Sequence, residues 1–159
     1  MPITRQKTEI TVRTTNPAEK SAVALITRYL DVDILAMRSY GDREGDVTLL
    51  ISSDVPKTLR ALQASGLRCK TNPVVLVGPL ARPGLAAPIG SQLVAVGIEV
   101  QYSYSSQKQP RQHYLVFRTA SDERACRVIE DIPFLRNQAT GETRRRHPQP
   151  MTELSAHTA

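Results

Sequence analysis

Hydrophobic and polar positions along the chain alternate with two different periods, whose order predicts the elements of the fold. Residues 9–14 place Ile10 and Val12 on one face with polar neighbours, which is typical of a half-buried strand. After Asn16-Pro17 the apolar positions follow helical spacing, which predicts an amphipathic helix. Residues 32–40 and 47–52 alternate again on either side of a glycine-containing turn, which predicts a hairpin.

A second helix and a closing strand complete this first pattern. Asp54 is placed to cap a helix that ends near Gly66. Residues 67–71 then return to an extended pattern. The sequence therefore predicts the order strand, helix, strand, strand, helix, strand for the first half of the chain.

The same order recurs in the second half, and this internal repeat is the most informative feature of the sequence. A shift of 66 residues aligns Pro17 with Pro83, and a shift of 67 aligns Leu50 with Phe117. A one-residue difference in the length of the hairpin loop accounts for the change of shift.

The second copy begins with an apolar strand at residues 74–77 and a helix that we expect to open at Pro83-Gly84. A hairpin and a last helix follow. Pro133 stops that helix, and we expect Phe134-Leu135 to form the last strand, because no other apolar residues follow directly.

The predicted fold class is α+β, with two ferredoxin-like βαββαβ units. Each unit is expected to have an antiparallel four-stranded sheet with both helices on one face, because each helix has one apolar stripe to bury. We assign residues 8–71 to the first domain and residues 72–136 to the second. Residues 137–159 are rich in Gln, Thr, Arg, Pro and Ser, which predicts a disordered basic tail.

Three stretches of the second copy carry a family resemblance: residues 77–85, 96–100 and 114–118. The first contains Ala81-Arg82-Pro83-Gly84-Leu85, which fits a strand-to-helix loop of the form Asp-x-Pro-Gly-apolar except that Ala81 replaces the acidic residue. With the repeat, they make residues 8–132 resemble tandem ACT domains. The resemblance implies regulatory modules that bind amino acids at sites between paired domains.

The resemblance implies a ligand site formed by Ala81, Arg82, Pro83, Gly84 and Leu85, with polar groups from a strand of a neighbouring copy at Val100 and Gln101. Independently of the family, a helix N-terminus leaves backbone N–H groups unpaired and attracts an anion such as a carboxylate. Gly84 allows a ligand to approach the backbone closely. The alternative interpretation is a tight, well-capped turn without a ligand. In the first copy Asn16 occupies the equivalent place and either contacts a ligand or caps the helix.

The charge balance and the order of elements raise a rival interpretation, an RNA-recognition-like module. The chain has 21 Lys and Arg against 15 Asp and Glu, a net charge of +6. Only 4% of its residues are aromatic, which leaves little for stacking bases. Tyr114 and Phe117 are three residues apart and face opposite sides of their strand. We therefore do not expect specific nucleic-acid binding.

The sequence offers no catalytic constellation, so we expect a non-enzymatic protein without a cofactor or bound metal. The chain has three histidines, two of which lie in the basic tail. No phosphate-binding or dinucleotide-binding glycine motif occurs. The acidic residues at positions 42, 44 and 46 fall in a hairpin turn, where they are expected to be solvated.

The remaining expectations concern the setting of the protein. The N-terminal residues are polar and no apolar stretch could span a bilayer, and two distant cysteines indicate free thiols. These features predict a cytoplasmic protein without membrane contact. We expect a homodimer that binds an amino acid and acts on a regulated enzyme or protein partner. A purely protein-interaction module is the further alternative.

Overall fold

The computed structural model describes residues 3–136, and all structural statements below concern that part of the chain. The tail predicted for residues 137–159 lies outside it. The elements follow the order β1 (Thr4–Thr14), α1 (Pro17–Tyr29), β2 (Ile34–Asp42), β3 (Gly45–Ser52), α2 (Val55–Ala64), β4 (Arg68–Leu80), α3 (Ala86–Ala95), β5 (Val100–Gln109), β6 (Gln112–Thr119), α4 (Asp122–Glu130) and α5 (Pro133–Arg136). The α+β class and the βαββαβ-type arrangement are thereby confirmed, but the expected pair of separate four-stranded sheets is wrong, because the two units share strands of one six-stranded sheet.

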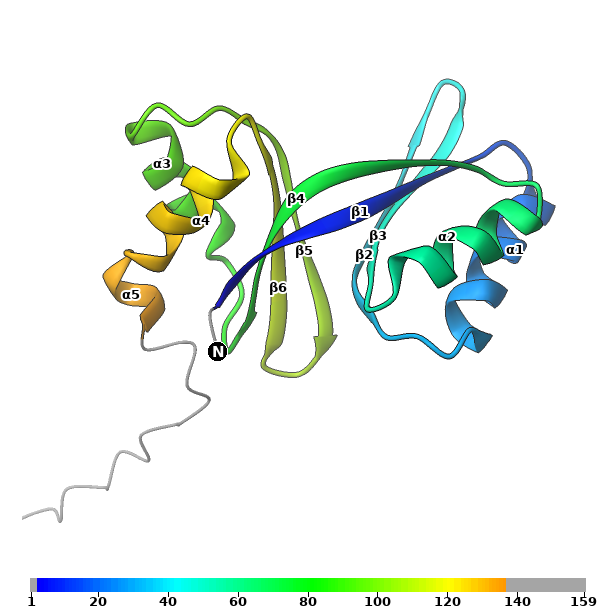
Figure 1. The fold of residues 1–159 in the computed structure, drawn as a ribbon, viewed down its shortest axis with the longest axis horizontal. Coiled ribbons are helices and arrows are strands. Elements are labelled where there is room, and N and C mark those ends of the chain that lie inside the picture. The colour runs from blue at the N-terminus through cyan, green and yellow to red at the C-terminus, as the bar shows by residue number, and fades with distance from the viewer. Residues whose placement is uncertain (1–2, 137–159) are drawn as a thin grey trace, which may run out of the picture.

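The strands form one six-stranded antiparallel sheet in the order β2-β3-β1-β4-β6-β5. Its two central strands belong to both units. The later part of β1 pairs with β3, from Ile10 opposite Leu50 to Thr14 opposite Asp46. The later part of β4 pairs with β6. Figure 1 shows β1 and β4 crossing the molecule as two long neighbouring strands that connect its halves.

The last strand of the second unit is therefore not Phe134-Leu135, and that prediction was wrong. The N-terminal part of β1 takes this place, with Thr4 opposite Val77 and Lys7 opposite Val74. Phe134 and Leu135 lie in α5, where Leu135 is buried in the second core. Pro133 favours this outcome because proline fits the first turn of a helix and cannot donate to a strand ladder.

The strands predicted at residues 67–71 and 74–77 are one continuous strand, β4, so the predicted domain boundary between residues 71 and 72 falls inside it. The helix predicted to open at Pro83-Gly84 begins later, at Ala86. Gly84 has φ +83°, a left-handed conformation that does not belong to a right-handed helix. Pro88 lies in the first turn of α3, where its missing N–H removes no hydrogen bond within the helix.

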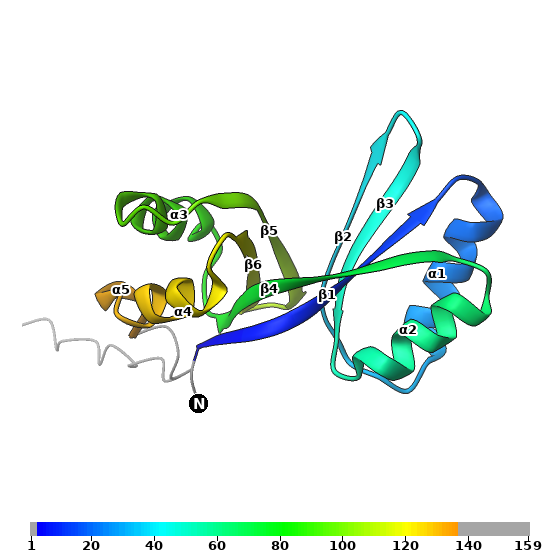
Figure 2. The ribbon, with the colours of Figure 1, turned by 45° about the horizontal axis from the view of Figure 1, so that its top comes forward.

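Each unit has its own hydrophobic core beneath its helices. In the first unit, α1 and α2 cover the sheet around Ile10, Val12 and Leu50. In the second, α3, α4 and α5 cover it around Val75, Val77 and Phe117. Figures 1 and 2 show these two groups of helices at opposite ends of the molecule, with the strands between them.

A third core lies between the units, on the faces of the sheet that carry no helices. It joins Ala36, Leu49 and Ile51 of the first unit to Tyr104 and Val116 of the second. The backbone N–H of Met37 on β2 donates to Ser106 Oγ on β5 at 3.1 Å. The two copies thus pack against each other through their helix-free faces.

Candidate functional site

The loop Ala81–Leu85 joins β4 to α3 and is the site that sequence analysis singled out. Its first four residues are exposed, whereas the side chain of Leu85 is only 5% exposed and anchors the loop in the second core. A Cβ built on Gly84 would have no heavy atom within 4 Å. The backbone at Gly84 therefore faces open space, as a ligand contact would require.

The N-terminus of α3, which follows this loop, has no side-chain cap. Leu85 occupies the N-cap position without a side-chain hydrogen bond, and the first turn contains no acidic residue. By contrast, Asp54 Oδ1 accepts a hydrogen bond from the N–H of Lys57 at the start of α2, at 3.1 Å. The backbone N–H groups of Ala86 and Ala87 thus combine a positive helix end with donors that no side chain caps, which is chemistry suited to a carboxylate, whereas Pro88 in the same turn has no N–H.

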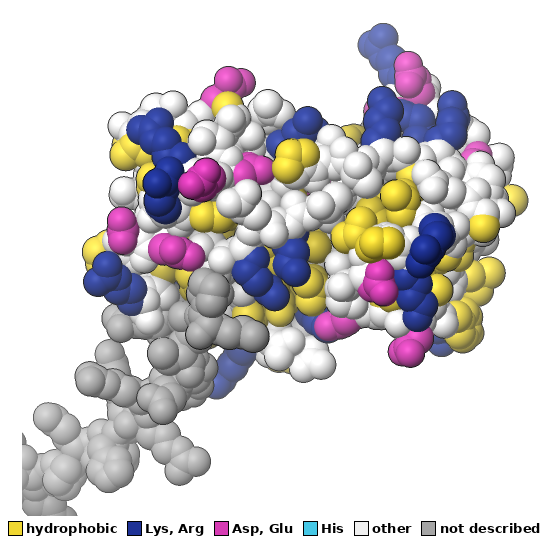
Figure 3. Space-filling view, viewed as in Figure 1, with side chains coloured by type: hydrophobic (Ala, Val, Ile, Leu, Met, Phe, Trp, Pro, Cys, Tyr) yellow, Lys and Arg dark blue, Asp and Glu magenta, His cyan; other side chains and the backbone are white. Residues whose placement is uncertain are grey.

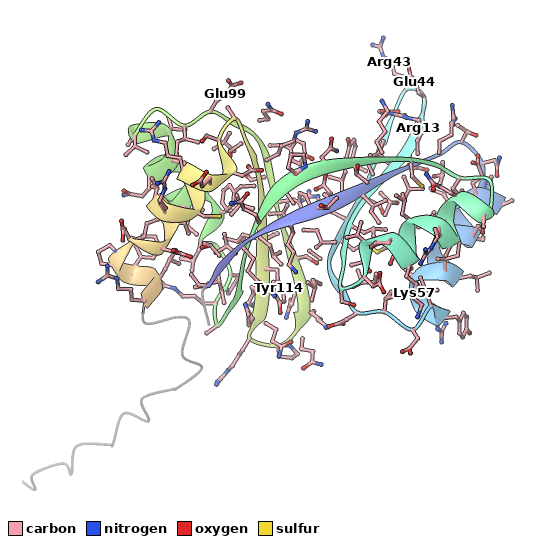
Figure 4. The ribbon with its side chains drawn as sticks, in the orientation of Figure 1. Arg13, Arg43, Glu44, Lys57, Glu99 and Tyr114 are labelled. Carbon is pink, nitrogen blue, oxygen red and sulfur yellow. The ribbon has the colours of Figure 1, made fainter. Side chains whose placement is uncertain are left out.

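Val100 and Gln101 do not lie beside this loop in the same chain. Leu80, at the end of β4, is opposite His113 on β6, whereas Val100 is opposite Thr119. Those two β6 residues are six positions apart, which corresponds to about 20 Å along a strand. Figure 4 shows Glu99, the residue before Val100, at the upper edge of the second unit, whereas β4 ends at the lower edge.

Asn16 caps α1. Its Oδ1 accepts a hydrogen bond from the N–H of Glu19 at 2.9 Å, and its Nδ2 donates to Glu19 Oε1 at 3.1 Å. The same Glu19 oxygen accepts hydrogen bonds from the N–H and hydroxyl of Thr15. These contacts resemble a capping box, except that Glu19 accepts from the N–H of Thr15 rather than of Asn16, and they engage the side-chain amide of Asn16 in capping.

The strongest polar cluster in the interior is one that sequence analysis missed. Glu9, on β1, is 0% exposed, and its two carboxylate oxygens accept hydrogen bonds from the phenols of Tyr102 at 2.5 Å and Tyr104 at 2.7 Å. Glu9 alternates with Ile10, and that pattern places a polar residue toward solvent when only one face of the sheet is covered. Here the second face is covered by the other unit, which no local pattern could reveal.

The aromatic side chains that suggested an RNA-binding platform are used in packing. Tyr104 and Tyr114 lie in the core between the units, with Tyr102 packed against it, and Phe117 lies on the opposite face in the second core. Tyr104 and Tyr114 are buried and Phe117 lies in a core, so these strands offer no open row of rings on which successive bases could stack. Figure 3 shows Lys and Arg side chains interspersed with Asp and Glu on the visible surface. Residues 3–136 thus carry no row of exposed rings of the RNA-recognition type.

The described residues contain no group of three His, Cys, Asp or Glu side chains that could hold a metal ion. Cys69 and Cys126 are free and partly buried, and burial raises the pKa of both thiols. Among residues 3–136 there is also no helix long and apolar enough to cross a membrane.

The arrangement of strands and helices is that of an α+β protein with the ACT-type fold, so the resemblance is confirmed at the level of the fold. Protein BT0572 from Bacteroides thetaiotaomicron superimposes with a TM-score of 0.64 at 18% identity, over 80% of this chain and 88% of that one. The aspartokinase alpha and beta subunits give 0.53 at 18% identity, over 79% and 93%. The ligand-free regulatory subunit of aspartate kinase from Thermus thermophilus gives 0.51 at 10% identity, over 79% and 93%. No protein-family model and no curated protein sequence matches the chain.

Proposed function

We propose that this chain is a non-catalytic regulatory protein that binds an amino acid through its carboxylate at the loop Ala81–Leu85. The observation that carries this proposal is the uncapped start of α3 behind an open Gly84. Its N–H groups would bind the carboxylate, and the exposed Arg82 adds positive charge to the same loop. The similarity in fold to regulatory subunits of aspartate kinase supports a role in controlling an enzyme.

The proposed site is completed by a second copy of the chain. Within one chain Val100 and Gln101 are remote from the loop, at the opposite end of the edge strand β5. A second β5 running antiparallel beside the first would bring its Val100 and Gln101 level with the loop. The exposed side chains of Val94, on the neighbouring helix α3, and of Val96, just after that helix, supply apolar surface for such pairing. The proposal therefore includes a homodimer that joins two second units side by side.

The test is calorimetric titration of the common amino acids into the wild-type protein and two glycine variants. Gly84→Val places a branched side chain where the ligand carboxylate would lie, and we expect it to abolish binding. Gly66→Val is the matched control, because Gly66 has a similar φ of +77° with open space around it and lies far from the loop, after α2. Both variants carry the strain of a left-handed non-glycine residue, about 1–2 kcal/mol, so only the effect on the site differs.

Sedimentation of the same samples measures whether the protein that binds the amino acid is a dimer. A ligand that binds Gly84→Val and wild type equally would have to bind elsewhere and would refute this site. A folded wild type that binds no amino acid would leave a protein-interaction module as the better interpretation. Binding by a strictly monomeric wild type would contradict the role assigned to the second copy.

A further inference from the structure

A cavity opens between the two units, at a place remote from the α3 loop. It has a volume of about 300 Å³, at the lower end of the range typical of small-molecule sites. Strands from both units line it: Arg38, Tyr40, Leu49, Tyr102, Ser103 and Tyr104. An occupant of this cavity would contact β2 and β3 of the first unit and β5 of the second at the same time.

Hydrogen bonds to a buried carboxylate fix the tyrosine side chains that form the aromatic wall of this cavity. The rings of Tyr102 and Tyr104 stack with their centres 6.4 Å apart and their planes inclined by 22°. Their hydroxyl groups both donate to the buried carboxylate of Glu9. Because these phenols are fixed, the rings cannot rotate freely, and little side-chain entropy remains to be lost when a ligand binds.

The charges around the cavity favour an anion. Arg38 is exposed and forms no ion pair with any residue between 3 and 136. The guanidinium of Arg118 lies 6.0 Å from the ring centre of Tyr102. Glu9 is the acidic group nearest the aromatic wall, but both of its oxygens already accept phenolic protons and it is sealed from solvent. Arg38 is therefore the one charged residue among those that line the cavity, and the nearby carboxylate of Glu9 is enclosed.

We propose that the cavity between the units is a second ligand site, which binds a planar aromatic carboxylate. The aromatic ring would lie against Tyr40, Tyr102 and Tyr104 above Leu49, and the carboxylate would pair with the guanidinium of Arg38. This site takes a different class of ligand from the α3 loop and does not depend on it.

The experiment titrates 2-naphthoate into the full chain by calorimetry, beside the neutral 2-naphthamide and the non-planar cyclohexanecarboxylate. We expect the naphthoate to bind at least tenfold more tightly than either analogue. Arg38→Gln should weaken naphthoate binding about tenfold or more, because it removes a charge-assisted contact. The matched control is Arg43→Gln, at the exposed tip of the β2–β3 hairpin and away from the cavity lining (Figure 4).

A structural readout locates the probe. The chain has no Trp and five Tyr, three of which line the cavity, so NMR shifts of the tyrosine ring protons should change at Tyr40, Tyr102 and Tyr104. Gly84→Val should leave naphthoate binding unchanged, which separates this site from the α3 loop. Equal binding of the amide, equal weakening by Arg38→Gln and Arg43→Gln, or absence of naphthoate binding at millimolar concentration would each overturn the proposal.

Discussion

Glu9 shows how one residue connects the two halves of the protein. A buried carboxylate is costly unless its oxygens are satisfied, and here two phenols satisfy them. Glu9 lies on a strand shared by both units, whereas both tyrosines lie on β5 of the second unit. The contact therefore fixes β5 relative to the central strands.

The same contact predicts sensitivity to alkaline pH. Burial, and then the hydrogen bond to Glu9, raise the pKa of Tyr102 and Tyr104 above the ordinary tyrosine value. The unfolded chain releases these phenolic protons near pH 10 while the folded chain retains them, so the free energy of unfolding should fall as pH rises above about 10. We expect this fall in urea unfolding at pH 8, 9, 10 and 11.

The double variant Tyr102→Phe/Tyr104→Phe supplies the comparison. It is expected to be less stable at pH 8, because Glu9 loses both donors, but to show a shallower decline above pH 10. The readout is the slope of the unfolding free energy against pH rather than its absolute value. Identical slopes for the variant and wild type would contradict the assignment.

At the scale of elements, the two equivalent loops between strand and helix have diverged. The loop before α1 ends in an asparagine that caps the helix, and the loop before α3 ends without a side-chain cap. The first has a hydrogen-bonded helix start and the second has vacant donors. This difference assigns a capping role to Asn16, and the ligand site that we propose lies in the second copy alone.

Asn16→Ala should therefore lower the unfolding free energy by about 1 kcal/mol, the usual cost of losing such a cap. Asn16→Asp should retain most of that stability, because a carboxylate can accept the same N–H hydrogen bond from Glu19. Chemical denaturation measures both effects, and calorimetry should show unchanged amino-acid affinity. Loss of amino-acid binding in a folded Asn16→Ala protein would show that Asn16 belongs to the ligand site.

Sequence patterns predicted the elements well where one element buries one face. The helices after Asn16-Pro17 and after Asp54 are examples. The strand at residues 47–52 was also predicted, although it is buried on both faces. The same logic missed the start of β1, because Thr4–Lys7 carries no apolar alternation. It also misplaced Phe134-Leu135, because apolar character alone does not distinguish a short helix from a strand. The cavity between the units depends on how the two sheet faces meet, which no local pattern contains.

At the scale of the whole molecule, the shared strands join two repeated units into one structure. The first unit uses the later part of β1 and the earlier part of β4, and the second unit uses the remaining parts of both. Neither unit has a complete sheet of its own strands once the chain is divided at residue 71. We therefore expect a single cooperative unfolding transition for the intact chain.

A fragment of residues 72–159 should not fold alone, because β4 would lose its neighbour β1 and expose the strand edge that includes Val74 and Val77. Adding a synthetic peptide of residues 1–14 should restore structure in part. Two-dimensional NMR spectra of the fragment, with and without peptide, measure both effects. A well-dispersed spectrum from the fragment alone would show that the predicted domain is independent.

The sharing of β1 also determines when the protein can complete its fold during synthesis. Thr4 donates a hydrogen bond to Glu130, 126 positions later, so the first strand leaves the ribosome long before its last contact exists. Such non-local contacts slow folding. Until Val74–Val77 are synthesised, the segment Thr4–Lys7 has no partner strand, and its charged side chains at Arg5 and Lys7 discourage pairing with other nascent chains. We therefore expect the polar character that concealed this strand in the sequence pattern to limit aggregation of the newly synthesised chain.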